Sequence, residues 1–398
     1  MMAPRQIFVT GMFRSGTTLV ARMLAIHPDL AFASDPYAPI FKALRNAVAA
    51  HTVDAHNDEE APLDDYYFDT AKCDLFEAIR SADLQSLSAP HDLAPLREKL
   101  ARQCLSYSPR IEPLLPNLDG SSFAELIESG FQLVAEAYGN GDESAVGLKE
   151  VWSGEFVWPL LACFPNAKAV VMVRDPRAVV ASKNVSAEKY PWLFLARQWR
   201  KLAALAWLAK HDEQLSGRVH LVRYEDLVQH PDAGVSELCE AVGVSFDKRL
   251  LDPEEYRDGD GAPWFQNSSH YSQVRNFNRG SLTRWRDVLS TEETAFIEAI
   301  CWPEMLLLGY ELEQFNPRRP DNTTFSSPPI VETDDLAGWI QPYGMDDPQL
   351  VSEEMAHERL RTEMLSGRSQ LSEDKLRVHL LDPSLHQPLK EAFDNGHC

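Results

Sequence analysis

Short apolar runs alternate along the chain with segments of helical periodicity. The runs at residues 6–10, 145–148, 168–173 and 219–223 are rich in Val, Ile, Phe and Leu and bounded by polar residues, which is typical of buried strands. Helical spacing of apolar residues covers residues 17–27, 123–138, 154–164, 176–187, 193–215 and 231–242. Strands separated by helices predict an α/β fold with a mostly parallel central sheet flanked by helices.

This alternation is interrupted in two places. An insertion at about residues 50–120 separates the runs at 6–10 and 145–148. After residue 316 the alternation stops: residues 317–348 look extended, and 353–365 and 372–381 predict short amphipathic helices. We therefore expect one domain over residues 1–316 and a partly helical C-terminal extension over 317–398. The extension is expected to pack on the domain or to form a homodimer contact.

Composition narrows the class of protein. The 398 residues carry a formal net charge of -22, which disfavours nucleic acid and long polyanions as partners. No apolar run reaches the roughly 18 residues of a membrane span, and the first apolar segment is too short for a signal peptide. The six cysteines include no C-x-x-C pair, so reduced thiols and a soluble cytoplasmic protein are expected.

The segment QIFVTGMFRSGTTLVARML, at residues 6–24, carries the strongest chemical signal. An apolar strand runs into a turn with Gly11 and Gly16, and a helix begins at Thr17 and Thr18. Backbone N–H groups in such a turn point into one concavity, and the helix dipole favours an anion there. The pattern therefore predicts a phosphate-binding loop of the P-loop type. On this loop alone, the first functional interpretation is an ATP-dependent kinase or nucleotide triphosphatase.

The order of residues in this loop departs from that of a nucleotide triphosphatase. A Walker loop needs Lys directly after its second glycine, whereas here the cation, Arg14, precedes Ser15 and Gly16. Arg-Ser-Gly-Thr-Thr after a strand resembles the 5′-phosphosulfate loop of sulfotransferases that use 3′-phosphoadenosine 5′-phosphosulfate (PAPS). The arginine form is more similar to the tyrosylprotein and related bacterial enzymes than to the cytosolic ones.

The segment AKAVVMVRDPRAVVASKN, at residues 167–184, supports this resemblance. Arg174 follows a buried strand, Asp175 can cap the next helix, and Pro176 suits its first turn. Ser182 lies eight residues after Arg174, about two turns into the helix. An arginine at a strand end and a serine on the helix can hold one phosphate from two sides. The family's 3′-phosphate site has this arginine, this serine and this spacing.

Three further segments match the family in the expected order. Tyr224, in LVRYEDLVQHP, resembles the tyrosine that contacts adenine. Arg279 and Gly280, in FNRGSLTRW, resemble the Arg-Lys-Gly segment that closes over the 3′-phosphate, although Asn278 precedes them here. Lys149, in VGLKEVW, corresponds to a lysine near the sulfuryl group.

The resemblance implies an in-line displacement at sulfur. An acceptor oxygen or nitrogen attacks, and 3′-phosphoadenosine 5′-phosphate (PAP) leaves as negative charge collects on the bridging oxygen. Cations fixed nearby stabilise that charge, and Arg14 and Lys149 are the candidates, with Thr17 and Thr18 on the 5′-phosphate. A sulfuryl group carries less charge than a γ-phosphoryl group, so no metal is expected.

The acceptor must also lose a proton to a general base. The histidine of cytosolic sulfotransferases would fall on Val151, so that mechanism does not transfer. The glutamate of tyrosylprotein-type enzymes falls, twenty-one residues after Arg14, on Asp35 in FASDPYAPIF. Asp35 is therefore the predicted base, with capping of the next helix as its alternative role. Glu150 is the reserve candidate, although it can instead orient Lys149.

The acceptor itself is not identified by these motifs. A small molecule, a glycan or a lipid suits the acidic surface better than a heparin-like polyanion. Besides the kinase, a protein that binds the nucleotide without catalysis stays open as an alternative.

Overall fold

The centre of the chain is a parallel β-sheet. The computed structural model describes residues 4–52, 64–151, 153–184, 190–264, 277–326, 348–369 and 372–395. Its strands are β1 (Arg5–Gly11), β2 (Leu30–Ser34), β3 (Ala145–Lys149), β4 (Lys168–Val173) and β5 (Val219–Arg223). All are parallel, in the order β2-β3-β1-β4-β5. The α/β fold with a parallel sheet flanked by helices is confirmed.

The strand β2 is a correction to the sequence analysis, which placed no strand between residues 10 and 145. Its sequence LAFAS has five residues and no β-branched side chain, so its propensity for strand formation is low. All five residues are nevertheless buried, because β2 pairs with β3 at the edge of the sheet. Residue 35 therefore follows a strand directly.

The chain divides into two compact units. The first comprises Met1–Glu59, Glu77–Val173 and Ala209–Arg279, and the second Glu60–Phe76, Arg174–Leu208 and Gly280–Cys398. The predicted division into residues 1–316 and 317–398 stays a prediction. Residues 53–63 of the predicted insertion, and 327–347, 370–371 and 396–398 of the predicted extension, lie outside the described residues.

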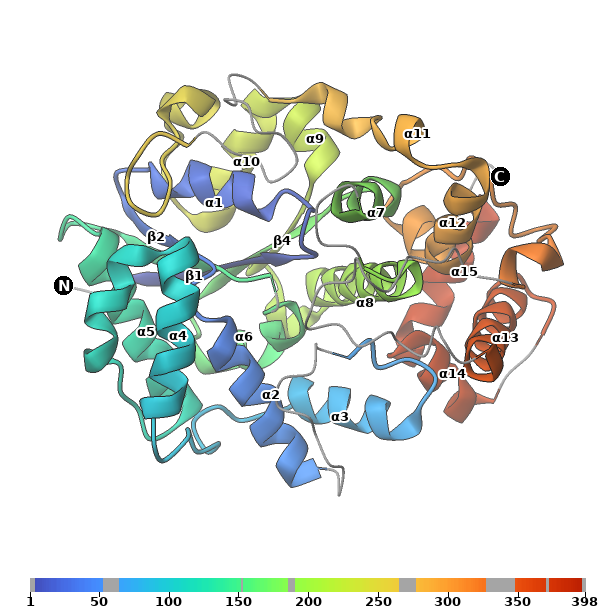
Figure 1. Ribbon diagram of the computed structural model, residues 1–398, viewed down its shortest axis with the longest axis horizontal. Helices are drawn as coiled ribbons and strands as arrows, with labels where there is room; N and C mark the ends of the chain where they lie inside the picture. Colours follow the sequence, from blue (N-terminus) through green and yellow to red (C-terminus); the bar gives the residue numbers. More distant parts are fainter. Residues whose placement is uncertain are drawn as a thin grey trace. The chain divides into compact units, whose positions relative to one another are not determined.

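Helices of the first unit cover both faces of its sheet, with α1 and α10 on one side and α4 and α5 on the other (Figure 1). The α-helices described wholly within this unit are α1 (Thr17–Ala25), α2 (Ala38–Thr52), α4 (Ala94–Tyr107), α5 (Phe123–Tyr138), α6 (Val157–Cys163), α9 (Tyr224–Gln229) and α10 (Pro231–Val242), and its 3-10 helices include η1 (Pro109–Asn117). Since both faces are covered, the strands are continuous apolar runs. The bounds of α5 and α10 are those predicted from sequence.

In the second unit helices pack on one another. They are α7 (Pro176–Asn184), α11 (Trp285–Val288), α12 (Thr291–Leu307), α13 (Pro348–Leu365), α14 (Glu373–Leu380) and α15 (His386–Asn395), while α3 (Thr70–Arg80) and α8 (Trp192–His211) each contain a boundary between units. Within the part of the chain described, no helix is long and apolar enough to cross a membrane.

Glu358 of α13 is buried and forms ion pairs of 2.6 Å with both Arg197 and Arg200 of α8. Arg361 of α13 is ion-paired with Glu304 of α12. These pairs bury charged side chains of α13 inside the second unit. The C-terminal segment is therefore part of this unit's core.

Candidate active site at the carboxyl edge of the sheet

The predicted phosphate loop joins β1 to α1 in the first unit. Arg14 (φ 70°) and Gly16 (φ 97°) both have left-handed backbone conformations, and alternation of this kind turns successive N–H groups toward one side. The loop is held from within, because Ser15 donates from its N–H (3.0 Å) and its Oγ (2.5 Å) to the carbonyl oxygen of Met12. This geometry is suited to binding an anion.

The start of α1 is also suited to an anion. Its N-cap, Gly16, makes no side-chain capping bond, and no acidic residue lies in the first turn. The first N–H groups of a helix need acceptors, and here no side chain of the cap supplies one. Thr17 is buried and Thr18 is exposed, so their hydroxyls lie on different sides of the helix start.

Tyr224 packs against the phosphate loop. It follows β5 as the first residue of α9 and is buried. A Cβ atom added to Gly16 would lie 2.3 Å from Cδ2 of Tyr224. The structure therefore brings together two residues that lie 208 positions apart and that the sequence analysis assigned to one nucleotide site.

Lys149 and Asp35 meet at the ends of neighbouring strands. Ser34 of β2 lies beside Lys149 of β3, which in turn lies beside Val9 of β1. Lys149 Nζ forms an ion pair with Asp35 Oδ2, and the two residues are 3% and 9% exposed. In open α/β sheets, ligands bind beyond the carboxyl ends of the strands, and both side chains lie at that edge together with the phosphate loop.

The backbone of Asp35 is fixed in an uncommon conformation. Its φ of 50° is in the left-handed region, which aspartate tolerates better than most residues. Its N–H donates to the carbonyl oxygen of Lys149 (2.6 Å), and its Oδ2 accepts from Ser34 Oγ (3.2 Å). These contacts hold the carboxylate at the strand end. The alternative role, capping of α2, has no contact in the described structure to support it.

Glu150, the reserve candidate for the base, is buried behind this pair. Its Oε2 accepts from the N–H of Tyr37 (3.0 Å), so it supports the segment that carries Asp35. Burial raises the pKa of Glu150 well above its usual value, and the charge of Asp35 adds to this, while Lys149 opposes it. A carboxyl group of this kind holds its proton more readily than an exposed one.

The predicted 3′-phosphate residues Arg174 and Ser182 belong to the second unit, and both are buried. Arg174 Nη2 donates to the carbonyl oxygen of Ser281 (2.7 Å). Trp199 Nε1 donates to the carbonyl oxygen of Arg174 (2.7 Å). The arginine is therefore held at both its side chain and its main chain.

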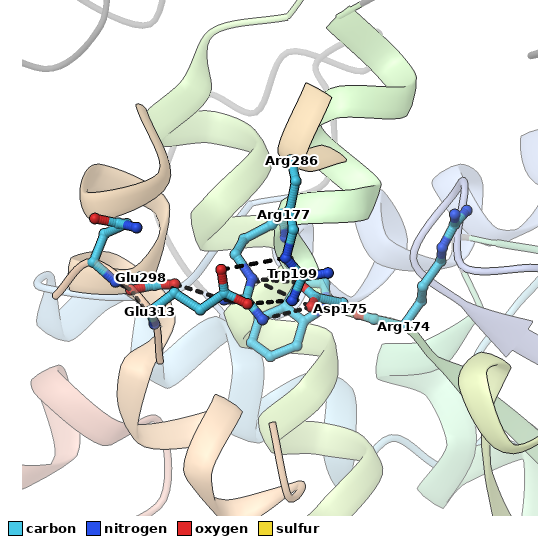
Figure 2. Close-up of polar contacts among 8 residues, drawn as sticks. Arg174, Asp175, Arg177, Trp199, Arg286, Glu298 and Glu313 are labelled. Carbon is cyan, nitrogen blue, oxygen red and sulfur yellow. Dashed lines mark hydrogen bonds and ion pairs between the residues drawn. The ribbon is translucent and has the colours of Figure 1, made fainter. Parts of the chain in front are cut away.

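The residues directly after Arg174 form an ionic network that was not predicted from the sequence (Figure 2). Asp175 caps α7, as predicted, because its Oδ1 accepts from the N–H of Arg177 (2.9 Å). The Arg177 side chain reaches back to Asp175 (Nη2 to Oδ2, 2.7 Å) and across to Glu298 of α12 (2.6 Å). It also lies 4.1 Å over the ring of Trp285. The start of α7 is thereby fixed to α12.

Arg279 is exposed at the end of the first unit, where its Nη2 donates to the carbonyl oxygen of Gln229 (2.9 Å). Gly280 begins the last segment of the second unit. Their predicted role in closing over the 3′-phosphate stays a prediction. In the described parts of the chain, no group of three or more His, Cys, Asp or Glu side chains could hold a metal ion.

Comparison with known proteins identifies a family. The profile of the Sulfotransferase family matches residues 4–248. Carbohydrate sulfotransferase 5 of Homo sapiens is 25% identical over 364 residues, which cover 81% of this chain and 84% of the relative. Carbohydrate sulfotransferase 3 of Rattus norvegicus is 27% identical over 212 residues, which cover 45% of this chain and 41% of the relative.

Among solved structures, the sulfotransferase domain from the Synechococcus PCC 7002 olefin synthase is similar, with a TM-score of 0.47 and 18% sequence identity. That match covers 78% of this chain and 96% of the domain.

Proposed function

Because this chain belongs to the sulfotransferase family and is a sulfuryl-transfer enzyme, we propose that its donor is PAPS and its acceptor is a hydroxyl group of a glycan. One observation carries the proposal. The buried Lys149–Asp35 pair and the phosphate loop lie at the same edge of one sheet. The glycan is proposed because curated relatives that are similar to this chain are named carbohydrate sulfotransferases.

In this proposal the phosphate loop holds the 5′-phosphosulfate. The backbone N–H groups from Gly16 to Thr18 and the hydroxyl of Thr17 donate to its oxygens, where the dipole of α1 favours negative charge. Tyr224, packed on Gly16, supplies a ring beside the loop for the adenine. Arg174 and Ser182 would bind the 3′-phosphate, with Arg279 and Gly280 covering it.

The proposed reaction is a single displacement. The acceptor oxygen forms a bond to sulfur while the bond from sulfur to the bridging oxygen breaks, and PAP departs with that electron pair. Arg14 and the ammonium group of Lys149 stabilise the negative charge that grows on the bridging oxygen. The proton of the acceptor hydroxyl passes to the carboxylate of Asp35.

Asp35 is preferred to Glu150 as the general base because of their surroundings. Asp35 follows the strand end directly and already touches Lys149, the residue proposed to face the sulfuryl group. Glu150 is buried, accepts a hydrogen bond from Tyr37, and has a pKa raised by burial. Because Glu150 is buried and its Oε2 is bonded to the N–H of Tyr37, we assign it a positioning role.

The donor is tested by calorimetric titration of the protein with PAP, beside ATP with Mg²⁺. We expect micromolar binding of PAP without added metal, because phosphate is bound by backbone and arginine donors. Binding of ATP with Mg²⁺ and not of PAP would contradict the proposed donor and would favour a kinase.

We also propose that the protein is located in the cytoplasm, because its scattered cysteines suit reduced thiols. A homodimer is proposed as well, with the C-terminal segment as its contact. Cell fractionation and the mass of the purified chain in solution test these two points. Recovery of the protein from a membrane-enclosed compartment, or a monomeric mass, would contradict them.

A further inference from the structure

A cavity of about 220 Å³ lies in the first unit beside α1 and β2. Its lining comes from α1, β2, the start of η1, the end of α5 and a tight loop at residues 257–261, and comprises Arg22, Ala25, Phe32, Ser34, Ser108, Arg110, Tyr138, Arg257, Asp258, Gly259 and Gly261. Pockets that bind drug-sized ligands have volumes of roughly 300–1,000 Å³. The space therefore suits a group of about the size of one sugar ring.

The charged side chains on the cavity wall are predominantly basic. The lining contains three arginines, Arg22, Arg110 and Arg257, and one carboxylate, that of Asp258, in a chain whose net charge is strongly negative. The Asp258 carboxylate is used within its own loop, where Oδ1 accepts from the N–H groups of Asp260 (3.0 Å) and Ala262 (2.9 Å). The lining side chains therefore carry an excess of positive charge, while the carboxylates of Asp35 and Glu255 lie nearby but outside the lining.

Arg22 is the innermost of these cations. Among the described residues, its buried Nε has no hydrogen-bond partner, and a buried donor without a partner costs free energy. Burial lowers the pKa of Arg22, and Asp258, Asp35 and Tyr138 oppose this only in part. An anionic group in the cavity would supply the missing acceptor and charge.

Arg110 and Arg257 leave donors available around the cavity. Within the described structure, Arg110 donates from Nη2 to the carbonyl oxygen of Asp260 (2.7 Å). Arg257 donates from Nη1 to the carbonyl oxygens of Glu254 (2.9 Å) and Tyr256 (3.0 Å), and its Nη2 lies 3.8 Å from Glu255. Each guanidinium has five N–H donors, so these contacts orient both arginines without using all of them.

The cavity is adjacent to the proposed base. Ser34 lines it and donates from Oγ to Asp35 Oδ2 (3.2 Å). Ser108, also in the lining, donates from Oγ to the carbonyl oxygen of Ser34 (2.8 Å). A sugar residue bound in the cavity would therefore bring its neighbour in the same glycan close to Asp35.

We propose that this cavity is an acceptor subsite that binds an acidic sugar residue, through a carboxylate or a sulfate ester paired with Arg22, Arg110 and Arg257. The inference rests on the proposed function, since it assigns the acidic sugar to a position next to the hydroxyl that is sulfated. Guanidinium groups bind both kinds of anion through paired N–H donors. The subsite selects an acidic acceptor although the protein as a whole is acidic.

The test compares three disaccharide acceptors in sulfate transfer from PAPS. One carries a uronic acid, the second is its methyl ester, and the third carries a sulfate ester on an otherwise neutral sugar. We expect kcat/KM for the uronic acid or the sulfate ester to exceed that for the methyl ester at least tenfold, and this ratio to fall as salt is added. Whichever anion gives the larger ratio identifies the natural group.

Variants then assign the preference to the cavity. Arg22→Gln should reduce the ratio of acid to ester toward one, and the more exposed Arg110→Gln and Arg257→Gln test the same point if Arg22→Gln does not fold. The control is Arg102→Gln, an exposed arginine of α4 that pairs with Glu98 (3.6 Å), which should keep the wild-type ratio. Equal use of the uronic acid, the sulfate ester and the methyl ester by the wild type, or a preference for an anion that survives in the folded cavity variants, would overturn the subsite alone.

Failure of the proposed function gives a different result. If PAP binds but none of the three acceptors is sulfated, the glycan acceptor is wrong, and the subsite is overturned with it. If all three are sulfated without discrimination, the proposed function stands and only the subsite is rejected.

Discussion

Lys149 and Asp35 form a buried ion pair between the ends of two adjacent parallel strands. The pair places a cation for the leaving group next to a carboxylate for the acceptor proton. The same ion pair also stabilises the fold, because Lys149 is 3% exposed and a buried charge needs a partner. Catalysis and stability must therefore be separated when either residue is changed.

Changing Asp35→Asn should lower kcat by about 10²–10⁴-fold, the usual contribution of a general base. Affinity for PAP should stay within a few-fold, because the phosphate loop is unchanged. The readouts are steady-state kinetics and calorimetry, with Asp119→Asn, an exposed aspartate of the same unit, as the matched control. Turnover within twofold of the wild type would reject Asp35 as the base and return attention to Glu150.

Gly16→Ala should weaken PAP binding by at least tenfold. The left-handed backbone at φ 97° costs a side-chain-bearing residue about 1–2 kcal/mol, and the new Cβ would lie 2.3 Å from the Tyr224 ring. Combining it with Tyr224→Ala removes the collision but leaves the backbone strain and also deletes the ring proposed to contact adenine, so PAP binding should not recover. Wild-type affinity in Gly16→Ala would show that the loop does not bind the donor.

Replacing Arg174→Lys or Ser182→Ala should reduce the preference for PAP over adenosine 5′-phosphate, which lacks the 3′-phosphate. A hydrogen bond to a charged group contributes about 1.5–3 kcal/mol, so we expect a loss of roughly ten- to a hundredfold in affinity for PAP. Trp199→Phe removes the bond to the Arg174 carbonyl and should give a smaller loss in the same ratio. If the ratio is unchanged in all three, the 3′-phosphate binds elsewhere.

Glu358→Gln should destabilise the second unit by about 3–5 kcal/mol, because it leaves Arg200 buried without its carboxylate partner. Arg197 also loses Glu358 but keeps ion pairs with Glu354 and Asp65. Burial alone would raise the pKa of Glu358, but the two arginines outweigh it and lower the pKa below 4.5. Its contribution is therefore present above pH 4.5 and is lost as pH falls through the lowered pKa.

Urea unfolding at several pH values checks this prediction. The difference between wild type and Glu358→Gln should be largest near neutral pH and should shrink in acid. Glu363→Gln, which breaks an exposed pair with Arg359 (3.4 Å), is the control and should cost at most about 0.5 kcal/mol. A Glu358→Gln variant as stable as the control would show that the C-terminal helix is not part of this core.

Local patterns in the sequence were sufficient to predict four of the five strands and the bounds of α5 and α10. The apolar runs that became β1, β3, β4 and β5 are rich in Val, Ile and Leu, and the ends of α10 are marked by Pro231 and by Gly243, which adopts φ 78°. The strand β2 was missed because Leu30–Ser34 contains Ala and Ser where strands usually have branched side chains. Its formation depends on pairing with β3, which is distant in sequence.

The candidate site was predictable where it lies within one segment, as in the phosphate loop and in Asp175 as the cap of α7. Contacts that depend on which strands are neighbours in the sheet were not predictable from the sequence. The ion pair of Asp35 with Lys149 requires β2 beside β3, and the Arg177–Glu298 bond joins residues 121 positions apart. The basic cavity likewise combines Arg22, Arg110 and Arg257 from distant segments, so no local pattern indicates it.

The most direct test of the central claim is transfer of labelled sulfate from PAPS to a glycan by the purified chain, measured beside Asp35→Asn. We expect a labelled glycan and stoichiometric PAP with the wild type, without ATP or Mg²⁺, and at least a hundredfold lower rate with the variant. Release of PAP without labelled acceptor, or labelling at equal rates by both proteins, would contradict this claim.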